Sequence, residues 1–375
     1  MAEAANPPQH VTLFLAGDVM TGRGIDQALP HPGDARLYEP GVKSAVEYLA
    51  LAEAANGPIP IPVDFAYVWG DALAELARRA PDARIVNLEA AVTAGGYPAP
   101  KGINYRMNPS NLPVLAAARL DCCVLANNHV LDWACEGLIE TLAVLQGAGF
   151  RTAGAGRSLA EASSPAVLPR RDGGRILVFG FGAVTSGIPR GWAAATDRPG
   201  IDLLPDLSPR TLQRVARQIG AVRQAGDVVV ASIHWGGNWG YEVPGAQRRF
   251  ARGLVDEAGV DVVHGHSSHH AKGIEVHRDR PILYGCGDFL NDYEGISGLE
   301  AFRSDLALMY FPTIDAASHR LVRLEMVPLR IRNFRLNRAT AHDSAWLRHV
   351  LVREGRKLGT SVRQGGDFSL ALEWG

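Results

Sequence analysis

The sequence predicts an α/β protein in which parallel strands come first and an antiparallel section follows. Short apolar runs alternate with amphipathic stretches along most of the chain, which is typical of a parallel sheet covered by helices. Several of these runs end in Gly-Asp, Asn or His, where α/β sheets gather their ligands. The last two runs, 306–311 and 321–326, have no helix between them and predict a hairpin-like unit.

The expected strands share a run of apolar residues that is bounded by turn residues. They lie at 11–18, 84–89, 121–126, 176–180, 227–234, 260–263 and 282–289. The expected helices carry apolar residues on one side. They cover 71–79, 137–146, 211–224, 250–258 and 344–356.

Two segments depart from this alternation. The stretch 26–64 is rich in Pro, Gly and Ala, and we expect an irregular insertion there. The chain after 331 shows a single helical pattern. We therefore predict one catalytic domain over 1–331, which contains the insertion, and a C-terminal helical extension over 332–375 that packs on it.

Composition excludes several classes of protein. The chain has 375 residues and a formal net charge of −1, so no basic field favours nucleic acid or an anionic membrane. No run is apolar enough to span a bilayer, and Met1 to His10 has neither the positive charge nor the apolar core of a signal peptide. We expect a cytoplasmic protein. The sequence carries no signal for an oligomeric state.

The four cysteines show no CxxC pairing and no spacing typical of small secreted domains. Two of them, Cys122 and Cys123, lie in an apolar run, where buried free thiols are common. Structural disulfides are therefore not expected, and a thiolate metal site is a weak option.

Histidines concentrate directly after one expected strand. Four of the twelve histidines fall within 264–270, in the stretch His-Gly-His-Ser-Ser-His-His. Neutral imidazole is the commonest metal ligand in proteins, although one histidine in a polar loop usually has a structural use. The other strand ends decide between these readings.

Other expected strands also end in side chains that bind metals. Each has a structural alternative: Asp18 could cap a helix, Asn127 and Asn128 could build a turn, and His234 could be a satisfied core histidine. Five separate strands with such ends make a shared metal site the better interpretation, and the mixed oxygen and nitrogen donors suit Zn, Mn, Fe or Ni. The residues are Asp18, Asn87, Glu89, Asn128, His129, His234, His266 and His269.

The ordered motifs Gly-Asp, Asn-Leu-Glu, Asn-Asn-His, His-Trp-Gly and Gly-His-x-x-His resemble those of the CapA (poly-γ-glutamate synthesis) family, over about residues 11–300. This family is a branch of the calcineurin-like metallophosphatase superfamily. The resemblance implies an α/β/β/α sandwich of four layers, with one or two divalent ions (Zn, Mn, Fe, Ni or Ca) at the C-terminal ends of the strands. It implies His129 as a catalytic residue and, as metal ligands, Asp18, Glu89, Asn128, His234, His266 and His269.

Two positions depart from the metallophosphatase pattern. Met20 stands where the first motif has a histidine, and Glu89 stands where the second has an aspartate. The loss of a nitrogen ligand favours a site with one strong metal. Phosphoester hydrolysis depends on two metals, so we rank it below carbonyl chemistry.

Further candidates surround this predicted site. Asp288 could cap a helix or hold a histidine in one tautomer, and we count it as catalytic together with His264. Structural or substrate-side roles are the alternatives for His264 and His270. The residues that we expect to bind substrate, or otherwise to form a solvated loop and cover a sheet edge, are Lys101, Tyr105, Arg106, Trp235, Asn238 and Trp239.

A metal that polarises an amide carbonyl permits either hydrolysis or removal of the α-proton. The sequence leans to the second outcome, epimerisation of a peptide residue, as in the CapA-like epimerases of lasso-peptide biosynthesis. Two features favour this choice: the N-terminus does not predict a signal peptide, and the first motif is altered. The alternatives are hydrolysis of peptide or poly-γ-glutamate amides, a phosphoesterase, and a non-catalytic binding protein in polymer export. We expect a peptide or polyglutamate-like substrate.

Overall fold

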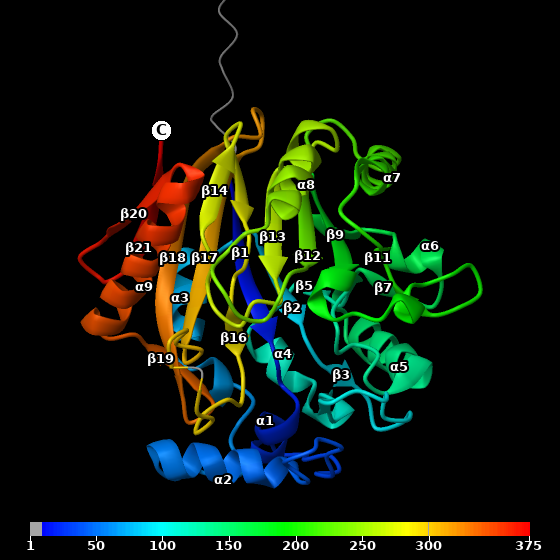
Figure 1. Ribbon diagram of the computed structural model, residues 1–375, viewed down its shortest axis with the longest axis vertical. Helices are drawn as coiled ribbons and strands as arrows, with labels where there is room; N and C mark the ends of the chain where they lie inside the picture. The colour runs from blue at the N-terminus through cyan, green and yellow to red at the C-terminus, as the bar shows by residue number, and fades with distance from the viewer. Residues whose placement is uncertain (1–9, 299) are drawn as a thin grey trace, which may run out of the picture.

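Two large β-sheets face each other at the centre of the protein (Figure 1). This computed structural model describes residues 10–298 and 300–375. The stretch from Met1 to His10, in which we expect no signal peptide, lies outside the described residues except for His10.

The first sheet is built around β1 (His10–Val19), which is buried along nearly its whole length. It pairs in parallel with β2 (Ala83–Leu88) and antiparallel with β17 (Leu306–Asp315). The short strand β16 (Asp288–Leu290) pairs in parallel with the end of β1. The other strands of this ten-stranded sheet are β5 (Cys122–Val124), β6 (Arg151–Ala153), β18 (Leu321–Arg332), β19 (Arg335–Arg338), β20 (Thr360–Gln364) and β21 (Leu370–Trp374).

The second sheet has seven strands, and its centre is parallel. Its middle strands are β12 (Val228–His234) and β13 (Val262–His266), whose register places His234 opposite His266. The others are β8 (Ala166–Pro169), β9 (Arg175–Ala183), β11 (Leu203–Leu204), β14 (Ile274–His277) and β15 (Arg280–Leu283). Two small pairs lie outside both sheets, β3 (Ala91–Val92) with β4 (Arg106–Met107) and β7 (Ala155–Gly156) with β10 (Gly200–Ile201).

Helices cover the outer face of each sheet. The ten-stranded sheet packs on α3 (Ala72–Arg79), α4 (Pro113–Ala117) and α5 (Ala134–Gly147). The seven-stranded sheet packs on α7 (Pro209–Gly220) and α8 (Gly245–Asp256). The inner faces share a core of alternate strand residues, such as Leu13 and Ile85 from one sheet and Val178 and Val230 from the other. The predicted α/β/β/α sandwich is confirmed.

Most expected elements are present, but the run 282–289 is not one strand. It is β15 in the seven-stranded sheet, a crossing at Tyr284–Gly287, and then β16 in the ten-stranded sheet. Gly287 adopts a φ of +77°, which permits the change of direction. The chain therefore passes from one sheet to the other in the middle of this apolar run.

Two further expectations need correction. The insertion 26–64 is not wholly irregular, because α1 (Arg23–Ala28) extends into it and α2 (Ala45–Asn56) lies within it. A capping box of Ser44 and Glu47 stabilises the N-terminus of α2. The segment 332–375 is not wholly helical. Besides α9 (Ala341–Gly355) it contains β19, β20 and β21, which extend the ten-stranded sheet. The remaining short helix is α6 (Leu159–Ala162).

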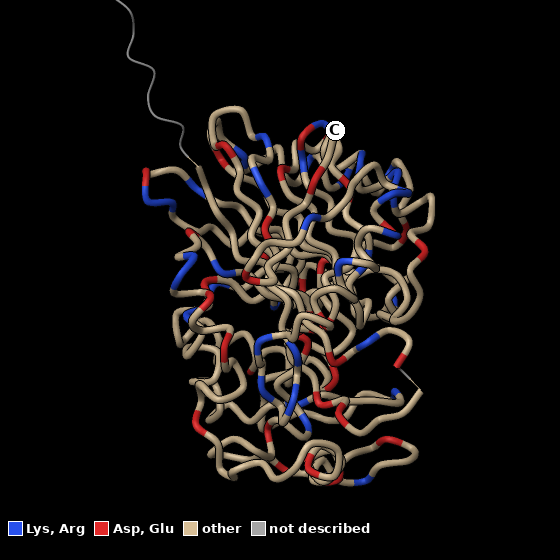
Figure 2. Tube along the Cα trace, turned by 90° about the vertical axis from the view of Figure 1, so that its left-hand side faces the viewer, with Lys and Arg blue, Asp and Glu red and all other residues tan. Residues whose placement is uncertain are grey.

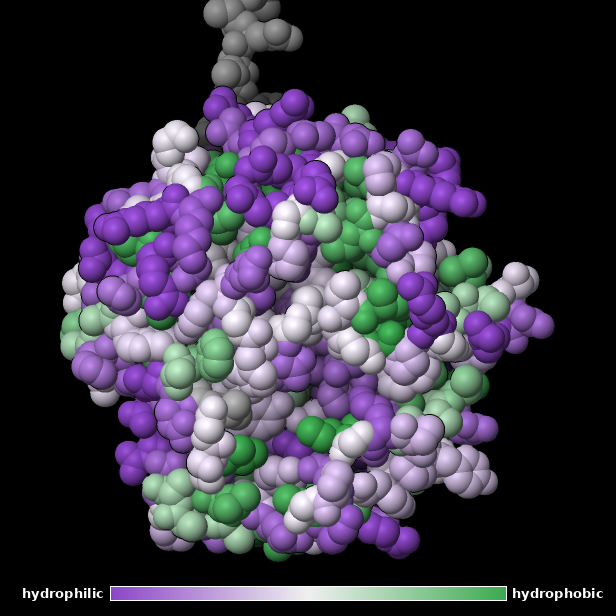
Figure 3. Space-filling view, in the orientation of Figure 1, coloured by the Kyte–Doolittle hydropathy of each residue, from purple (hydrophilic) through white to green (hydrophobic). Residues whose placement is uncertain are grey.

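Charged and apolar residues are mixed in the two views of the molecule in Figure 2 and Figure 3. Basic and acidic residues are intermixed along the chain in Figure 2. Hydrophobic and hydrophilic patches alternate on the face shown in Figure 3. Within residues 10–298 and 300–375, no helix combines the length and the apolar character that crossing a membrane requires.

Candidate metal centre

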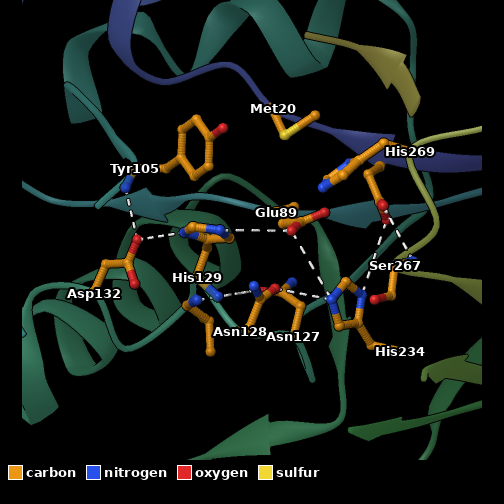
Figure 4. Close-up of polar contacts among 12 residues, drawn as sticks. Met20, Glu89, Tyr105, Asn127, Asn128, His129, Asp132, His234, Ser267 and His269 are labelled. Carbon is orange, nitrogen blue, oxygen red and sulfur yellow. Dashed lines mark hydrogen bonds and ion pairs between the residues drawn. The ribbon is translucent and has the colours of Figure 1, made fainter. Parts of the chain in front are cut away.

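The C-terminal ends of the parallel strands bring the predicted ligands together (Figure 4). Asp18 is the penultimate residue of β1, Glu89 follows β2, His234 ends β12 and His266 ends β13. Asn128 comes from the loop after β5. All of these elements are parallel neighbours or face each other across the two sheets, so their carboxyl ends meet at one edge.

Two histidines and one carboxylate form the centre of the cluster. The Nδ1 atoms of His234 and His266 face each other at 2.8 Å. Asp18 Oδ1 lies 4.0 Å from the first Nδ1 and 3.8 Å from the second. On its other side, the ring of His234 places Nε2 2.8 Å from Asn128 Oδ1 and 3.9 Å from Glu89 Oε1.

Amide side chains hold these ligands from behind. Asn87 Nδ2 donates to Asp18 Oδ1 at 2.8 Å, and Asn127 Nδ2 donates to Asn87 Oδ1 at 3.0 Å. Ser267 N donates to Asp18 Oδ2 at 3.1 Å. The turn role that was open for Asn127 is also present, because its Oδ1 accepts from the backbone N–H of His129. Such supporting bonds fix the orientation of metal ligands.

Burial shifts the pKa values of the carboxylates and imidazoles of this cluster towards their uncharged forms. Burial and the neighbouring Asp288 carboxylate raise the pKa of Asp18 to about 7. Burial and the charge of Asp18 raise the pKa of Glu89 well above its usual value. Burial lowers the pKa of His234 and His266 well below the usual value, which keeps both rings neutral. Neutral imidazoles beside carboxylates are the protonation states that a cation requires.

The residues fit a divalent cation. Glu89 Oε2 is buried and has no hydrogen-bond partner among the described residues. The donor set combines imidazole nitrogen with carboxylate and amide oxygen. Such a set suits a divalent first-row metal such as Zn, Mn, Fe or Ni. Asp18, His234 and His266 present ligand atoms that all lie within 4.8 Å of one another.

A second group of ligand atoms shares Asp18. Asp18, His269 and Asp288 also present atoms within 4.8 Å of one another. His269 Nδ1 lies 2.8 Å from Asp288 Oδ1, and Asn291 donates to Asp288 Oδ2 at 2.8 Å. Burial alone would lower the pKa of His269, but the Asp288 carboxylate outweighs it and the pKa is raised.

His129 faces the cluster with one nitrogen and is held by the other. Its Nδ1 lies 2.6 Å from Asp132 Oδ2, and its Nε2 lies 3.7 Å from Glu89 Oε1. Burial lowers the pKa of His129 to about 4. Sequence reasoning missed Asp132, which the spacing of three residues after His129 could have indicated.

The loop at 101–106 contains three of the residues that we expect to bind substrate. Lys101 Nζ donates to Asp132 Oδ1 at 2.8 Å, and Tyr105 packs its ring 4.2 Å from that of His129. Arg106 lies elsewhere, because its guanidinium stacks on Trp133 at 3.8 Å. The structure therefore brings Lys101 and Tyr105 to the site but not Arg106.

Of the other predicted residues, some lie at the site and others do not. Trp239 packs 5.2 Å from the His269 ring, whereas Trp235 is buried in the outer core and donates to Tyr284 O at 3.0 Å. The Asn238 backbone carbonyl accepts from His269 N at 3.0 Å. The His264 ring is fully buried between Ser232 Oγ at 3.0 Å and Ala16 O at 2.9 Å, and these contacts favour a structural role over a catalytic one.

Arg23 is a buried residue of the site region that the sequence did not indicate. It donates from Nε to Asp292 Oδ2 at 3.1 Å and from Nη1 to Glu39 Oε1 at 2.9 Å. Its guanidinium also lies 4.4 Å from the centre of the Tyr105 ring. Arg23 therefore packs against Tyr105, whose ring contacts His129.

An α/β/β/α sandwich with a carboxylate and histidine cluster at the joined strand ends is the architecture of metallophosphatase-like proteins, as the sequence motifs imply. The chain belongs to the family described as bacterial capsule synthesis protein PGA_cap, whose model matches residues 12–293. The predicted relationship to the CapA family is thereby confirmed.

Individual relatives agree with this family. A probable polyglutamine synthesis accessory protein of Mycobacterium tuberculosis is 47% identical over 360 residues, which cover 96% of this chain and 94% of the relative. The PGA biosynthesis protein CapA of Bacillus subtilis is 30% identical over 194 residues, covering 52% and 48%. A solved structure of a phosphatase from Mycoplasma pneumoniae aligns with a TM-score of 0.48 and 11% identity, over 88% of this chain and 96% of that one.

Proposed function

We propose that the protein is a divalent-metal-dependent hydrolase of amide bonds in a chain of glutamate or glutamine residues. The observation that carries this proposal is the position of His129, whose Nε2 faces the ligand cluster while Asp132 holds its Nδ1. The substrate class is inferred from the relatives, which are named for polyglutamine and PGA synthesis.

His129 has the protonation state of a base. Because the Asp132 carboxylate accepts the Nδ1 hydrogen, a neutral ring presents an unprotonated Nε2 to the cluster. Burial lowers the pKa of His129 to about 4, so the ring is neutral at physiological pH. His129 would take a proton from water that attacks the carbonyl and return it to the leaving amine.

The other residues fix this base and bind the cofactor. Lys101 Nζ and the backbone N–H of Tyr105 both donate to Asp132, which keeps the carboxylate directed at His129. Asp18, His234 and His266, with Asn128 and Glu89 beside them, would hold the cation. A divalent cation bound there would polarise the amide carbonyl.

Hydrolysis needs one base, whereas epimerisation needs a second acid on the opposite face of the α-carbon. The sequence leaned to epimerisation, and His129 is equally placed to remove an α-proton. Across the cluster, His269 is bonded through Nδ1 to Asp288 at 2.8 Å, as His129 is to Asp132, so its Nε2 could supply such an acid. We rank hydrolysis first because it needs only the His129 base and the cation, and we keep epimerisation as the alternative.

The test is incubation of the Mn²⁺-loaded protein with poly-γ-glutamate, poly-α-glutamate and polyglutamine peptides in D₂O, followed by mass spectrometry. Hydrolysis predicts shorter chains with one added water at each break. Deuterium at the α-carbon of an intact chain would favour epimerisation. Cleavage of an aryl phosphate at a higher rate than any amide would favour a phosphoesterase.

One variant makes this test specific. We expect His129→Ala to lower the turnover rate by about 10²–10⁴-fold, the usual contribution of a general base, with unchanged Mn²⁺ content. Absence of turnover on every substrate, with metal bound, would refute the proposal and favour a metal-stabilised binding protein.

A further inference from the structure

We propose that a cavity between the loop 235–244, α8 and the end of α9 binds the carboxylate group of a small organic acid. The cavity has a volume of about 340 Å³, and sites for small molecules have volumes of about 300–1,000 Å³. No residue of its wall belongs to the candidate metal centre. The inference therefore goes beyond the proposed function and does not depend on it.

The loop 235–244 connects this cavity to the candidate metal centre. Its Trp239 packs 5.2 Å from the His269 ring, and the Asn238 carbonyl accepts from His269 N at 3.0 Å. Two residues after Trp239, the ring of Tyr241 packs 4.5 Å from that of His270 and lines the cavity. The cavity is therefore a neighbour of the metal centre without being part of it.

Arg248 is a cation of the cavity wall without a hydrogen-bonded carboxylate. Its Nε lies 3.6 Å from Glu275 Oε2 and has no hydrogen-bond partner among the described residues. Glu275 is already satisfied, because Arg252 Nε donates to Oε1 and the Tyr284 hydroxyl donates to Oε2, both at 2.7 Å. The Arg248 side chain is 32% exposed, which leaves its guanidinium open to the cavity. A guanidinium with unused donors binds a carboxylate through two parallel hydrogen bonds.

The other charges of the wall do not balance Arg248. Glu354 accepts from both Arg353 Nε and Lys357 Nζ at 2.6 Å, so this carboxylate faces two cations of its own. The Glu242 carboxylate acts on the buried ammonium of Lys272, whose Nζ also donates to the Glu242 backbone carbonyl at 3.2 Å. Cations therefore outnumber carboxylates around the cavity, and the surplus attracts an anion.

The rest of the wall fits a short carbon chain better than an inorganic anion. Val243 and Leu358 are partly exposed apolar side chains that pack on the outer core and line the cavity. The Tyr241 ring adds apolar surface beside them, and its hydroxyl has no acceptor among the residues that the structure describes. Small-molecule sites combine such apolar walls with a few polar groups. The ligand is therefore an organic carboxylate whose chain lies against Val243 and Leu358.

Isothermal titration calorimetry of the full-length protein with glutarate, an aliphatic dicarboxylate, tests the site. We expect a Kd of about 1 mM or tighter, in the metal-free and the Mn²⁺-loaded protein alike. Arg248→Gln should weaken binding by about tenfold or more, because hydrogen bonds between charged groups are lost. Arg249→Gln is the matched control, since it removes the same charge from an exposed neighbouring position of α8 and should leave the Kd unchanged.

The variants should fold, because Glu275 keeps its bond from Arg252 when Arg248 is replaced, and thermal unfolding measures this. A second variant, Val243→Asp, leaves Arg248 in place and puts a negative charge in the wall. We expect it to weaken glutarate binding by about tenfold or more as well. Unchanged binding in both Arg248→Gln and Val243→Asp would place glutarate elsewhere on the protein and overturn the inference.

Three other results would also count against the site. One is the absence of glutarate binding to the wild type. Another is binding only after Mn²⁺ loading, because the acid would then be a ligand of the metal. The third is tighter binding of inorganic phosphate, titrated in parallel, which would overturn the assignment to an organic carboxylate. None of these measurements requires amide hydrolysis, so a failure of the proposed function leaves the test of this cavity intact.

Discussion

A methyl group added at Gly17 should separate β16 from β1. An alanine Cβ at this position would lie 1.8 Å from the carbonyl oxygen of Gly287. The obstacle is backbone rather than a flexible side chain, and Gly287 itself is fixed at a φ of +77°. We therefore expect Gly17→Ala to displace the strand that carries Asp288.

The structure gives the size of this effect. An ordinary carbon–oxygen contact is about 3.4 Å, so the backbones must move apart by roughly 1.6 Å. That movement breaks the bonds from Asp18 N to Gly287 O at 3.0 Å and from Met20 N to Leu290 O at 2.9 Å. Each buried donor left unpaired costs about 1–3 kcal/mol, so the free energy of unfolding falls by about 2–6 kcal/mol. For a chain of 375 residues this lowers Tm by about 3–8 °C.

Scanning calorimetry of the metal-free protein measures this change, and Mn²⁺ titration of the same samples reports whether the candidate ligands at the end of β1 are displaced. Gly237→Ala is the matched control, because a Cβ at Gly237 meets nothing within 4 Å. We expect the control to keep the wild-type Tm and metal content. A Gly17→Ala protein with the same Tm and metal content would refute the reasoning, because it would show that β16 can move without cost.

Three other perturbations test separate parts of the fold. Iodoacetamide should modify the native protein at the half-buried Cys135 alone. Burial raises the pKa of Cys123 to about 12, and the other two cysteines are also buried. Peptide mapping measures the modified sites, and early modification of Cys123 would contradict its burial. Hydrogen bonds from neighbouring hydroxyls lower the pKa of Asp206 to about 2, so its contribution to stability is present above the unfolded-state pKa and is lost as the pH falls towards 2. Urea unfolding should therefore show a deficit for Asp206→Asn at neutral pH that narrows in acid; a constant deficit would count against the linkage. Ser44→Ala should cost about 1 kcal/mol and speed amide exchange in α2, and unchanged exchange would mean that the capping box is dispensable.

The proximity of the candidate metal ligands was predictable because it follows from strand topology. Asp18, Glu89, His234 and His266 each stand at or just after the end of an apolar run. Parallel strands align their carboxyl ends, so sequence positions far apart become neighbours without any knowledge of packing. The ligand roles themselves stay predictions until metal binding is measured.

Contacts made across the chain could not be predicted in this way. Arg23 finds its carboxylate partner Asp292 at a separation of 269 residues, and neither residue ends a predicted strand with a recognisable motif. The run 282–289 reads as one strand because apolar periodicity does not record which sheet a residue joins. Asp132 lies in a turn, where burial depends on the tertiary fold.

The passage of the chain from β15 to β16 also bears on the order in which the molecule can assemble. His264 Nε2 donates across the two sheets to Ala16 O, 248 residues earlier in the chain, and Asp288 reaches Asp18 only after the crossing is made. Such distant pairings form late and slowly, because the loop entropy comes before the contact. We therefore expect the ligand cluster to form only after the two sheets have met. Metal uptake during refolding would report completion of the whole sandwich rather than collapse of either sheet.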